Sequence, residues 1–503
     1  MTRSTAQRDL SIAVIGAGFG GIAMGRRLLK AGIEDFTIFE AGSSVGGTWF
    51  FNTYPGAAVD TPSHMYSYSF RRYDWTRRFA DQDELLGYLT ATAEENGLYE
   101  HITFGTTIAS VRWDAATATQ LVTASDGREW RFDVVVSAVG VLGVPQHPQW
   151  PGRDAYRGAV VHTARWDPEL DWTGKRVAVV GTGSSSAQVV PAMAPASAEI
   201  TVFQRHPAWV DRRDDVVFTP QQRSWYSSRL GYGIERARFY WAQEKNWLGG
   251  RVAKPGSKVD RRALERCRTH MSEQVSDPEL LDLLTPRGPY MSKRPVRSNS
   301  YLPALQEPHV HLVPKAVSAF YEDGLVDVDG TRHPADIVVT ATGFRPAEYL
   351  YGLTVEGRDG RDLHETWGIE PAAFLGVTFP GFPNFFMMLG PNSNYYAMVY
   401  NLERQADFIA RVLRRMRRRG AAAAEVKPRY FTRFNDWLAK RLSRTSFAST
   451  DNYFRSASGK VVTQWPEGAL PFYLLTKLLA IPSTAFSGRR GPARADASGT
   501  PSP

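Results

Sequence analysis

Two segments of the chain share one order of apolar and glycine-rich stretches. Residues 11–40 run from a short apolar stretch through a glycine-rich turn and a helical pattern to a second apolar stretch. Residues 175–205 repeat that order, with apolar stretches at 177–180 and 200–203. Short apolar runs joined by a helical stretch are typical of parallel strands covered by helices. We therefore predict an α/β fold with two Rossmann-like dinucleotide-binding domains.

The turn of the first segment has the GxGxxG spacing of a dinucleotide-binding site. Gly16 permits a tight turn, Gly18 lets the backbone approach a pyrophosphate, and Gly21 lets the helix pack on the strand. Phe19 lies within this turn, where the helix N-terminus would face the phosphates. Glu40 follows Gly16 by 24 residues, a position from which a carboxylate accepts hydrogen bonds from a ribose. A nucleotide with a free ribose, as in FAD, is therefore predicted here.

The second segment differs from the first at its charged end. Gly181 and Gly183 match the first two glycines, and Ser186 takes the third position. At the offset of Glu40 the residue is Arg205, whose guanidinium accommodates a 2′-phosphate that a carboxylate would repel. The second segment is therefore predicted to bind NADPH. Further contacts to this cofactor are predicted for Ser184, Ser185, Gln188 and His206.

The remaining pattern gives a domain division. A proline-rich stretch at 144–151 marks a crossing between domains. Residues 211–282 lack strand signals and read as helices. The apolar run 337–344 resembles 134–140, which predicts a return to the first domain. We therefore predict an FAD-binding domain at 1–142 and 336–486, an NADPH-binding domain at 143–335 with a helical insertion at about 211–285, and a disordered tail at 487–503.

Composition narrows the class of protein. Of the 503 residues, 43% are hydrophobic and 22% charged, as in globular proteins. No apolar run of about 20 residues appears, so we expect no integral membrane segment and a cytoplasmic location. Cys267 is the single cysteine, which excludes a disulfide, a dithiol redox pair and a cysteine-rich metal site. No metal site is predicted.

The net charge of +9 suits anionic cofactors and does not require nucleic acid. Its densest positive run lies at the end of a predicted helix, 401–419, without interleaved aromatic residues. We therefore predict no nucleic-acid partner. For this basic helix end we favour a solvated face over a contact with an anionic membrane.

Two dinucleotide sites of opposite charge preference imply hydride transfer from a nicotinamide to a flavin. Reductases and oxygenases both use this arrangement. A flavin disulfide reductase needs two cysteines beside the flavin, and this chain cannot supply them. Two longer motifs add to the evidence. One is an aromatic-glycine-histidine-tryptophan pattern formed by Tyr156, Gly158, His162, Trp166 and Asp167, and the other is formed by Gly47, Trp49, Tyr54, Pro55, Gly56 and Asp60.

With these motifs the chain resembles the Baeyer–Villiger monooxygenases that use FAD and NADPH, over residues 12–465. The family pattern FxGxxxHxxxW is met with Tyr156 in place of phenylalanine, and Trp166 favours this branch over related enzymes that oxidise nitrogen or sulfur. The resemblance implies that NADPH reduces FAD and that O2 adds to give a C4a-peroxyflavin. This species would attack a ketone to give an ester or lactone.

The resemblance also implies roles for single residues. Arg294 would provide the cation beside the reacting group, and Asp60 would orient it. Lys293 would grip the 2′-phosphate together with Arg205. The pair His162 and Trp166 would couple domain motion to cofactor use. Further cofactor contacts are implied for Thr48, Trp49, Tyr66 and Asn392, a cover over NADP and substrate for Trp465, and an altered pocket for Asn452.

Two alternatives stay open at this point. A monooxygenase acting on nitrogen or sulfur would share both cofactor sites, and a catalytically silent flavin-binding protein would share the FAD site. The expected partners are a small ketone and O2. The sequence is compatible with a monomer or a homodimer.

Overall fold

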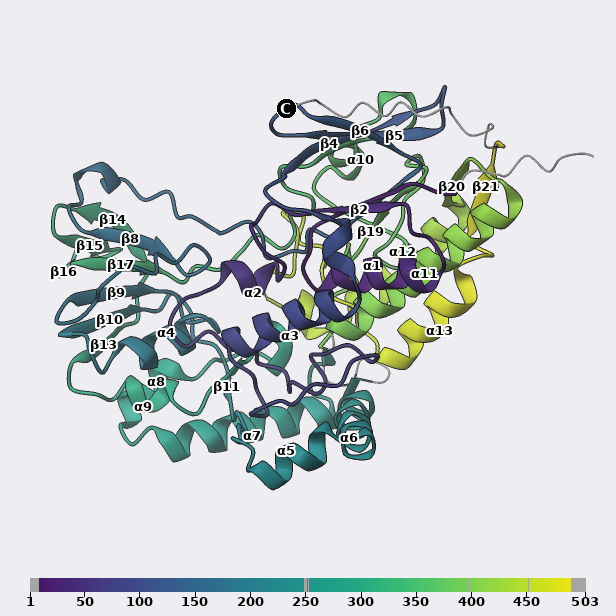
Figure 1. Ribbon diagram of the computed structural model, residues 1–503. Coiled ribbons are helices and arrows are strands. Elements are labelled where there is room, and N and C mark those ends of the chain that lie inside the picture. Colours follow the sequence, from purple (N-terminus) through teal and green to yellow (C-terminus); the bar gives the residue numbers. More distant parts are fainter. Residues whose placement is uncertain (1–8, 248–250, 252, 397, 451, 490–503) are drawn as a thin grey trace, which may run out of the picture.

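The computed structural model describes residues 9–247, 251, 253–396, 398–450 and 452–489. Its first sheet is parallel throughout, with the strand order β19-β7-β1-β2-β3. One face packs against helices, and the other packs against a second sheet of order β18-β4-β5-β6 (Figure 1). The strands are β1 (Ile12–Ile15), β2 (Phe36–Phe39), β3 (Ile102–Thr103), β4 (Ile108–Asp114), β5 (Thr119–Ala124), β6 (Glu129–Phe132), β7 (Val134–Ser137), β18 (Thr354–Glu356) and β19 (Phe385–Met387).

Helices close to the first sheet come from both halves of the chain. The first βαβ segment supplies α1 (Phe19–Lys30), and α11 (Met398–Arg419) packs beside it. Arg27 of α1 forms an ion pair with Asp407 of α11 at 2.6 Å. Others near this region are α2 (Thr48–Phe51) and α3 (Gln82–Glu95).

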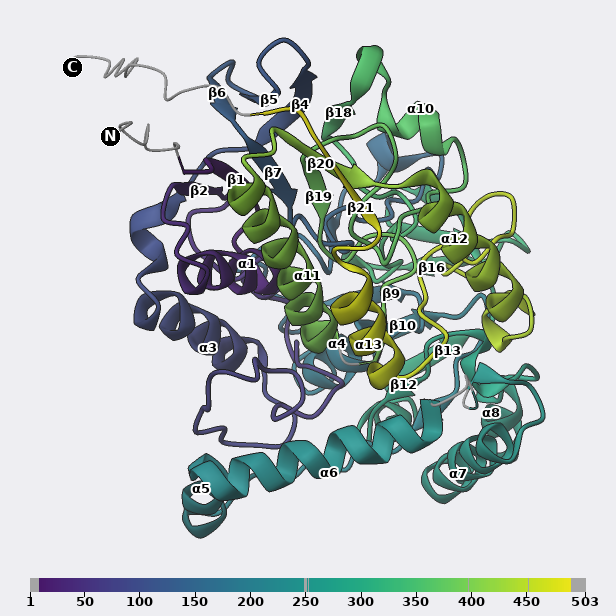
Figure 2. The same ribbon diagram turned by 90° about the vertical axis from the view of Figure 1, so that its right-hand side faces the viewer.

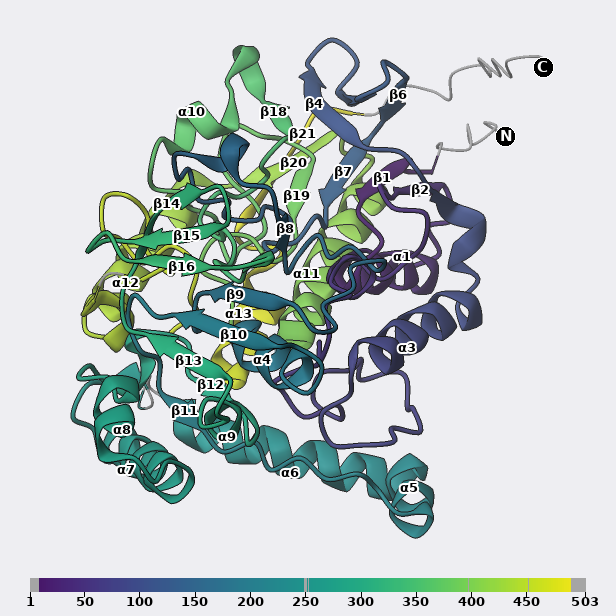
Figure 3. The ribbon, with the colours of Figure 1, turned by 90° about the vertical axis from the view of Figure 1, so that its left-hand side faces the viewer.

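The parallel sheet of the second βαβ segment has the strand order β13-β10-β9-β17-β8 (Figure 1). Figure 3 shows β8, β9, β10 and β13 from the left-hand side of that view. A small antiparallel sheet packs on it, sharing an apolar cluster that contains Val180 and Phe320. The elements are β8 (Ala159–His162), β9 (Arg176–Val180), α4 (Ser186–Met193), β10 (Glu199–Phe203), β13 (Val310–Val313), β17 (Ile337–Thr340), and the small sheet β14 (Val317–Tyr321), β15 (Gly324–Asp327) and β16 (Arg332–Pro334).

The predicted α/β class is confirmed, but one strand lies in the other sheet. The run Ile337–Thr340, predicted to return the chain to the first domain, is β17, between β9 and β8 of the second sheet. Apolar burial on both faces suits the centre of either parallel sheet, so the pattern did not specify the neighbours. The chain crosses back after β17, where Pro145 and Phe344 form an antiparallel bridge between the two crossing segments.

The described residues of the region predicted to be a helical insertion form the helices α5 to α8, in the lower part of Figure 1. Side-chain caps explain three of their starts: Thr219 forms a capping box with Gln222, and Ser257 and Asp277 accept from first-turn amides. The helices are α5 (Pro220–Ser227), α6 (Arg229–Trp247), α7 (Lys258–Gln274) and α8 (Pro278–Leu284).

Near the C-terminal end of the described residues, helix α13 packs beside α11 (Figure 2). Ser487, the first residue of the predicted disordered tail, ends strand β21, and 490–503 lie outside the described residues. No described helix has the length and apolar character needed to span a membrane. The remaining elements are α9 (Tyr301–Ala304), α10 (Leu363–Trp367), α12 (Pro428–Leu442), α13 (Ala469–Leu479), β11 (Val210–Asp211), β12 (Val296–Arg297), β20 (Ala423–Val426), β21 (Thr484–Ser487), and short 3₁₀ turns at Leu98–His101, Arg153–Ala155, Tyr290–Ser292, Arg358–Gly360 and Ser446–Ala448.

The two glycine-rich turns are built differently. A Cβ on Gly21 would lie 1.8 Å from the carbonyl oxygen of Gly16, and Gly16 itself has φ +102°. Helix α1 therefore starts three residues after Gly16, close against the strand. In the second turn, α4 starts five residues after Gly181, at Ser186. This later start leaves room for the serine side chain.

Replacing Gly21 by alanine tests this close approach. We expect Gly21→Ala to lower the free energy of unfolding by about 1–3 kcal/mol, because the helix must move off the strand. Gly233→Ala is the matched control: Gly233 is exposed within α6, and a Cβ added there would meet no atom of another segment within 4 Å. The control should stabilise by about 0.5–1 kcal/mol. Urea unfolding followed by circular dichroism measures both, and equal effects would contradict the close approach.

Candidate active site

The first glycine-rich turn has a floor made of backbone. Gly18 caps α1 without any side-chain hydrogen bond, so the first-turn N–H groups have no side chain over them at this cap. Gly47 lies against it: a Cβ on Gly47 would be 3.0 Å from the Cα of Gly18. A floor of this kind, at a helix N-terminus, fits the pyrophosphate of a dinucleotide.

Glu40 joins two loops of this cradle. Its buried carboxylate accepts from the backbone N–H of Ala17 and of Gly42, both at 2.7 Å. A carboxylate has about four acceptor positions, so these bonds leave capacity for a ribose hydroxyl. Contact with ribose stays a prediction.

Trp49 and Tyr66 form an aromatic wall beside Phe19. The indole Nε1 of Trp49 donates to the Tyr66 hydroxyl at 3.3 Å, and the Tyr66 ring packs edge-on against Phe19 with centroids 5.1 Å apart. Burial raises the pKa of Tyr66 to about 12, so its hydroxyl stays protonated at neutral pH. Thr48, a further predicted contact, is the first residue of α2 behind this wall.

An ion pair between Asp60 and Arg294 joins segments that are 234 residues apart in the chain. The Arg294 Nε donates to Asp60 at 3.0 Å, and Nη2 donates to the two carboxylate oxygens at 2.8 and 2.6 Å. The Asp60 side chain is 20% exposed and that of Arg294 43%. The pair predicted from sequence to act together is therefore in direct contact, and the guanidinium remains accessible.

The charges around this pair fix its ionisation. Burial by itself would raise the pKa of the Asp60 carboxyl, but Arg294, and to a smaller extent Arg297 and Arg213, bring that pKa below its ordinary value. The negative charge of Asp60 in turn raises the pKa of Arg294. Both groups therefore stay charged at neutral pH.

A buried network holds the segment that carries Arg294. Strand β12, directly after Arg294, pairs with β11. Asp211 of β11 is 2% exposed and accepts from Arg266 at 2.8 and 2.5 Å and from the Tyr290 hydroxyl at 2.8 Å. A buried carboxylate with three bonds from two partners fixes its neighbours firmly. Arg294 therefore extends from a rigid support beside the helical insertion.

Tyr453 and Arg297 are residues near the pair that sequence reasoning missed. The Tyr453 side chain interacts with Arg294, and Arg297 lies over the Tyr396 ring at 5.4 Å. Asn452, noted for replacing an aromatic residue, instead bonds the carbonyl oxygens of Phe447 and Thr450. The aromatic ring is supplied one position later, and a search allowing a one-residue shift would have found it.

Gln188 and Tyr54 connect α4 of the second βαβ segment to the loop that follows α2 beside the first sheet. The Tyr54 hydroxyl donates to Gln188 Oε1 at 2.7 Å, and Gln188 Nε2 donates to the Ala58 carbonyl oxygen at 2.9 Å. A Cβ on Gly56 would lie 2.7 Å from the Gln188 carbonyl oxygen, so the loop lies directly on α4. The Gln188 amide, predicted to contact the cofactor, is used to hold this junction.

The second glycine-rich turn is open and cationic. Gly183 is exposed with no heavy atom within 4 Å of its Cβ position. Arg205 and His206 are exposed at the end of β10, and Thr182 Oγ1 donates to the His206 carbonyl oxygen at 3.1 Å. Ser184 and Ser185 form the turn into α4, and Lys293 precedes Arg294. This open turn beside an arginine fits a nucleotide with a 2′-phosphate.

Trp465 and Asn392, predicted to contact cofactor or substrate, instead contact other parts of the protein. The ring of Trp465 is fully buried, with its Nε1 donating to the Gly468 carbonyl oxygen at 3.0 Å and its ring packed near Phe434 and Phe472. In this conformation it does not cover a cofactor, because apolar side chains of α12 and α13 hold it inside the molecule. The amide of buried Asn392 donates to the carbonyl oxygens of Val461 and Gln464, so it fastens a loop.

The His162 motif lies at the crossing between the sheets. His162 ends β8, and its ring lies 5.2 Å from His147 and 6.2 Å from Phe344, one on each crossing segment. Its Nδ1 accepts from the Ala164 N–H at 3.0 Å. Burial, with a further contribution from His147, lowers the pKa of His162 to about 4, so the ring is neutral at pH 7.

The other motif residues support that crossing. The Tyr156 hydroxyl donates to the Ala335 carbonyl oxygen at 3.0 Å, and a Cβ on Gly158 would lie 2.2 Å from that hydroxyl. The Trp166 ring packs edge-on against Trp172, and Asp167 accepts from the Glu169 N–H at 3.0 Å. These contacts give every motif residue a structural partner, consistent with a role in joining domains.

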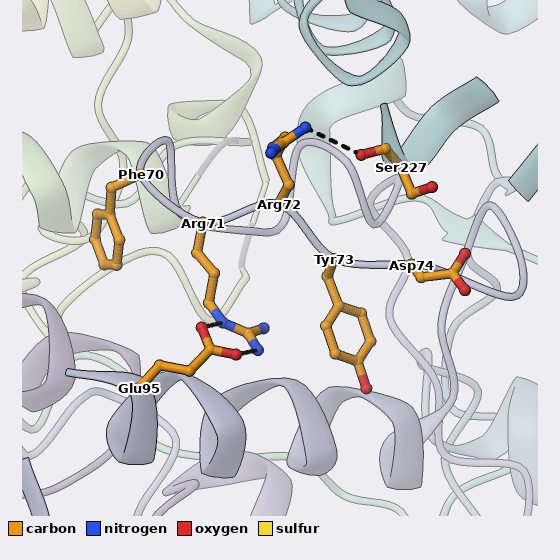
Figure 4. A pocket seen from close by; sticks show the side chains of 7 residues that line it. All are labelled: Phe70, Arg71, Arg72, Tyr73, Asp74, Glu95 and Ser227. Atoms are coloured by element: carbon orange, nitrogen blue, oxygen red, sulfur yellow. Dashed lines mark hydrogen bonds and ion pairs between the residues drawn. The ribbon is translucent and has the colours of Figure 1, made fainter. Parts of the chain in front are cut away.

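A separate hollow between α3 and α5 has its charges already paired. Figure 4 shows Arg71 bonded to both oxygens of Glu95, at 2.7 and 2.5 Å, and Arg72 donating to the Ser227 carbonyl oxygen at 3.4 Å. Asp74 forms an ion pair with Arg223 at 2.6 Å. We assign no chemistry to this hollow.

Two parallel sheets, each with a glycine-rich turn, together with an arginine–aspartate pair that joins their segments, are the features of a nicotinamide-dependent flavoprotein. A family model described as flavin-binding monooxygenase-like matches residues 9–223. A Baeyer–Villiger monooxygenase of Pseudomonas aeruginosa is 34% identical over 511 residues, covering 99% of this chain and 96% of its own. A phenazine N-monooxygenase of Lysobacter antibioticus is 33% identical, covering 80% of this chain and 81% of its own.

A solved structure also shows this similarity to flavin-dependent monooxygenases. Cyclohexanone monooxygenase from Rhodococcus sp. Phi1 bound to NADP+ superposes with a TM-score of 0.86 at 27% identity, covering 96% of this chain and 99% of that one. The chain belongs to the Baeyer–Villiger monooxygenase family of flavin-dependent enzymes. It is an FAD- and NADPH-dependent monooxygenase, as the sequence predicted.

Removing the charge of Asp60 tests the ion pair. We expect Asp60→Asn to lower oxygenated product per NADPH consumed by at least about tenfold, because Arg294 loses its bidentate anchor and the nearby arginines repel one another. FAD content should be unchanged. Asp214→Asn is the control, since Asp214 pairs with Arg212 on the open surface. Product and NADPH are measured together, and equal coupling in both variants would contradict the assigned role.

The neutral buried ring of His162 predicts a pH-dependent stability. The unfolded chain takes up a proton near pH 6.5, whereas the folded chain does so only near pH 4. The unfolded state therefore binds more protons in this window, and the free energy of unfolding falls as pH drops from 6.5 to 4. His162→Asn keeps an acceptor for Ala164 and should flatten this fall. Urea unfolding at pH 7 and pH 5 measures it, and an unchanged slope would refute the assignment.

Proposed function

We propose that the enzyme inserts one oxygen atom of O2 beside the carbonyl of a small ketone, giving an ester or lactone. The observation that carries the proposal is the accessible guanidinium of Arg294, held by Asp60 where the FAD-side loop meets the segment that follows the helical insertion. The names of the relatives support the same reaction. Bound FAD supplies the transfer of electrons from NADPH to O2.

Arg294 is suited to stabilise negative charge that develops on a reacting oxygen. A guanidinium stays protonated at all relevant pH values, and here the pKa is raised further by Asp60. Because the donors are already fixed by Asp60, little reorganisation is needed when the charge appears. Tyr453 interacts with Arg294, and the charge of Arg297 acts on Asp60, so both residues would complete one wall of the substrate site.

The cofactors would be bound by the two glycine-rich turns. We propose that the N–H groups at Gly18 bind the FAD pyrophosphate and that Glu40 accepts from its ribose. Arg205 and Lys293 would bind the 2′-phosphate of NADPH, with His206 and the serines of the second turn beside it. Support comes from the open cationic turn and from the backbone floor at Gly18.

We propose a domain division that follows the sheets. The FAD-binding domain would comprise about 1–142 and the chain after 341, and the NADPH-binding domain about 143–340 with the helical insertion. Membership of β17 in the second sheet supports the later boundary. We also propose a cytoplasmic location and a monomeric or homodimeric state.

Oxidation of nitrogen is the second candidate, favoured by the relative named as a phenazine N-monooxygenase. Both reactions would use the same cofactor turns. The first reaction forms an ester from a ketone, and the second forms an N-oxide from an aromatic amine or N-heterocycle. One panel that contains both kinds of substrate therefore distinguishes the two reactions.

Removing the Arg294 side chain tests the reaction. We expect Arg294→Ala to keep reduction of FAD by NADPH but to lower ester formation from a ketone panel by about 100-fold or more. Arg223→Ala is the matched control, because Arg223 bonds Asp74 with the same two-pronged geometry and is 40% exposed. Flavin bleaching and ester yield are the two measurements.

Two results would overturn this proposal. Unchanged ester yield in Arg294→Ala would remove Arg294 from its role. An N-oxide or sulfoxide formed without any ester across the panel would replace the ketone reaction by the second candidate.

A further inference from the structure

The outer face of α13 carries three exposed leucines. Leu470, Leu474 and Leu478 are 52%, 43% and 62% exposed, and their spacing of four places them along one side of the helix. The opposite side, with Phe472 and Thr476, is buried against the molecule. We call these three residues the leucine face; Figure 2 shows α13 at the surface beside α11. Exposed apolar surface of this continuity is typical of a binding face.

Trp241 extends this apolar region onto α6. Glu244 of α6 accepts from the N–H of Ala469 at 2.7 Å and of Leu470 at 3.2 Å, so α6 meets the first turn of α13. Trp241 lies one helical turn before Glu244 and is 71% exposed. Its indole therefore projects from the surface near the start of the leucine face.

Positive charge borders the leucine face along α11. Arg404, Arg411, Arg415 and Arg418 follow one another at helical spacing on one side of α11. The Tyr473 ring of α13 lies 5.7 Å from the Arg404 guanidinium, and its hydroxyl accepts from Lys477 Nζ at 2.8 Å. Among the described residues, no carboxylate lies within ion-pairing distance of Arg411, Arg415 or Lys477. These cations are available for an anionic partner.

The combination of leucines with unpaired cations points to a lipid surface. A second copy of the chain would bring an identical arginine stripe to the contact, on a protein whose net charge is +9. Residues 490–503 contain no leucine, isoleucine, valine or aromatic residue, so they offer no apolar match. At 11 residues α13 is too short to span a bilayer, but this length and pattern suit a helix that lies along its surface.

We propose that this face docks the enzyme on an anionic membrane, which replaces the solvated face that the sequence favoured for the basic end of α11. The leucine face enters the acyl boundary, Trp241 lies at headgroup level, and Arg411 and Lys477 bind lipid phosphates. The association is peripheral and depends on salt. It concerns a surface separate from Arg294 and does not depend on which substrate is oxidised.

Vesicle sedimentation of the FAD-loaded enzyme tests the proposal. Vesicles of phosphatidylcholine with about 30% phosphatidylglycerol should bind the enzyme at about 0.05 M salt and release it at higher salt, whereas pure phosphatidylcholine should bind it weakly. Leu474→Glu should weaken binding at least about tenfold, and Arg411→Gln combined with Lys477→Gln should also weaken it about tenfold or more. NADPH oxidation with a soluble substrate should be unchanged in each variant.

Leu283→Glu is the matched control, because Leu283 is 42% exposed on the separate helix α8. Retained FAD confirms that each variant is folded. Absence of binding to the anionic vesicles at low salt would overturn the proposal, as would equal loss of binding in Leu474→Glu and Leu283→Glu. Analytical ultracentrifugation measures the oligomeric state of the enzyme and of Leu474→Glu. A dimer that this substitution converts to a monomer would show that a second copy of the chain, and not a membrane, covers this face.

Discussion

The bidentate pair between Asp60 and Arg294 is the interaction on which the active-site arrangement depends. It joins a loop beside the FAD cradle to the segment that follows the helical insertion in the other half of the molecule. Desolvation opposes partial burial of both charges, and their mutual attraction with three hydrogen-bond contacts offsets it. The rigid Asp211 network behind Arg294 makes this geometry reproducible. The Arg294 guanidinium is therefore held in one position before any substrate binds.

The relative placement of the two nucleotide turns rests on a second set of contacts. Tyr54, Gly56 and Gln188 bring the FAD-side loop onto α4, and the crossing segments pair at Pro145 and Phe344. Around that crossing the His162 motif fills space with buried rings and a neutral imidazole. Hydride transfer between two cofactors requires their reacting rings to meet, so the same contacts that stabilise the interface also serve the reaction.

The C-terminal segment connects the active site to the outer surface. Tyr453 reaches Arg294, Trp465 is locked in the core, and α13 presents its leucines outward within 26 residues of the chain. The docking proposed for α13 would therefore place a lipid surface at the end of the same segment that begins with Tyr453.

The family resemblance implied the partnership of Asp60 with Arg294. The sequence by itself determined the α/β class, both glycine-rich turns, and the charge difference between Glu40 and Arg205. These depend on local spacing or on motifs, which a linear chain displays directly. The tertiary structure decided the sheet that takes β17, the burial of Trp465, the use of Gln188 and Asn392 as structural ties, and the approach of Tyr453 to Arg294. Such features depend on which distant surfaces pack together, and an apolar or amide side chain fits many partners equally well until the fold brings one of them within contact distance.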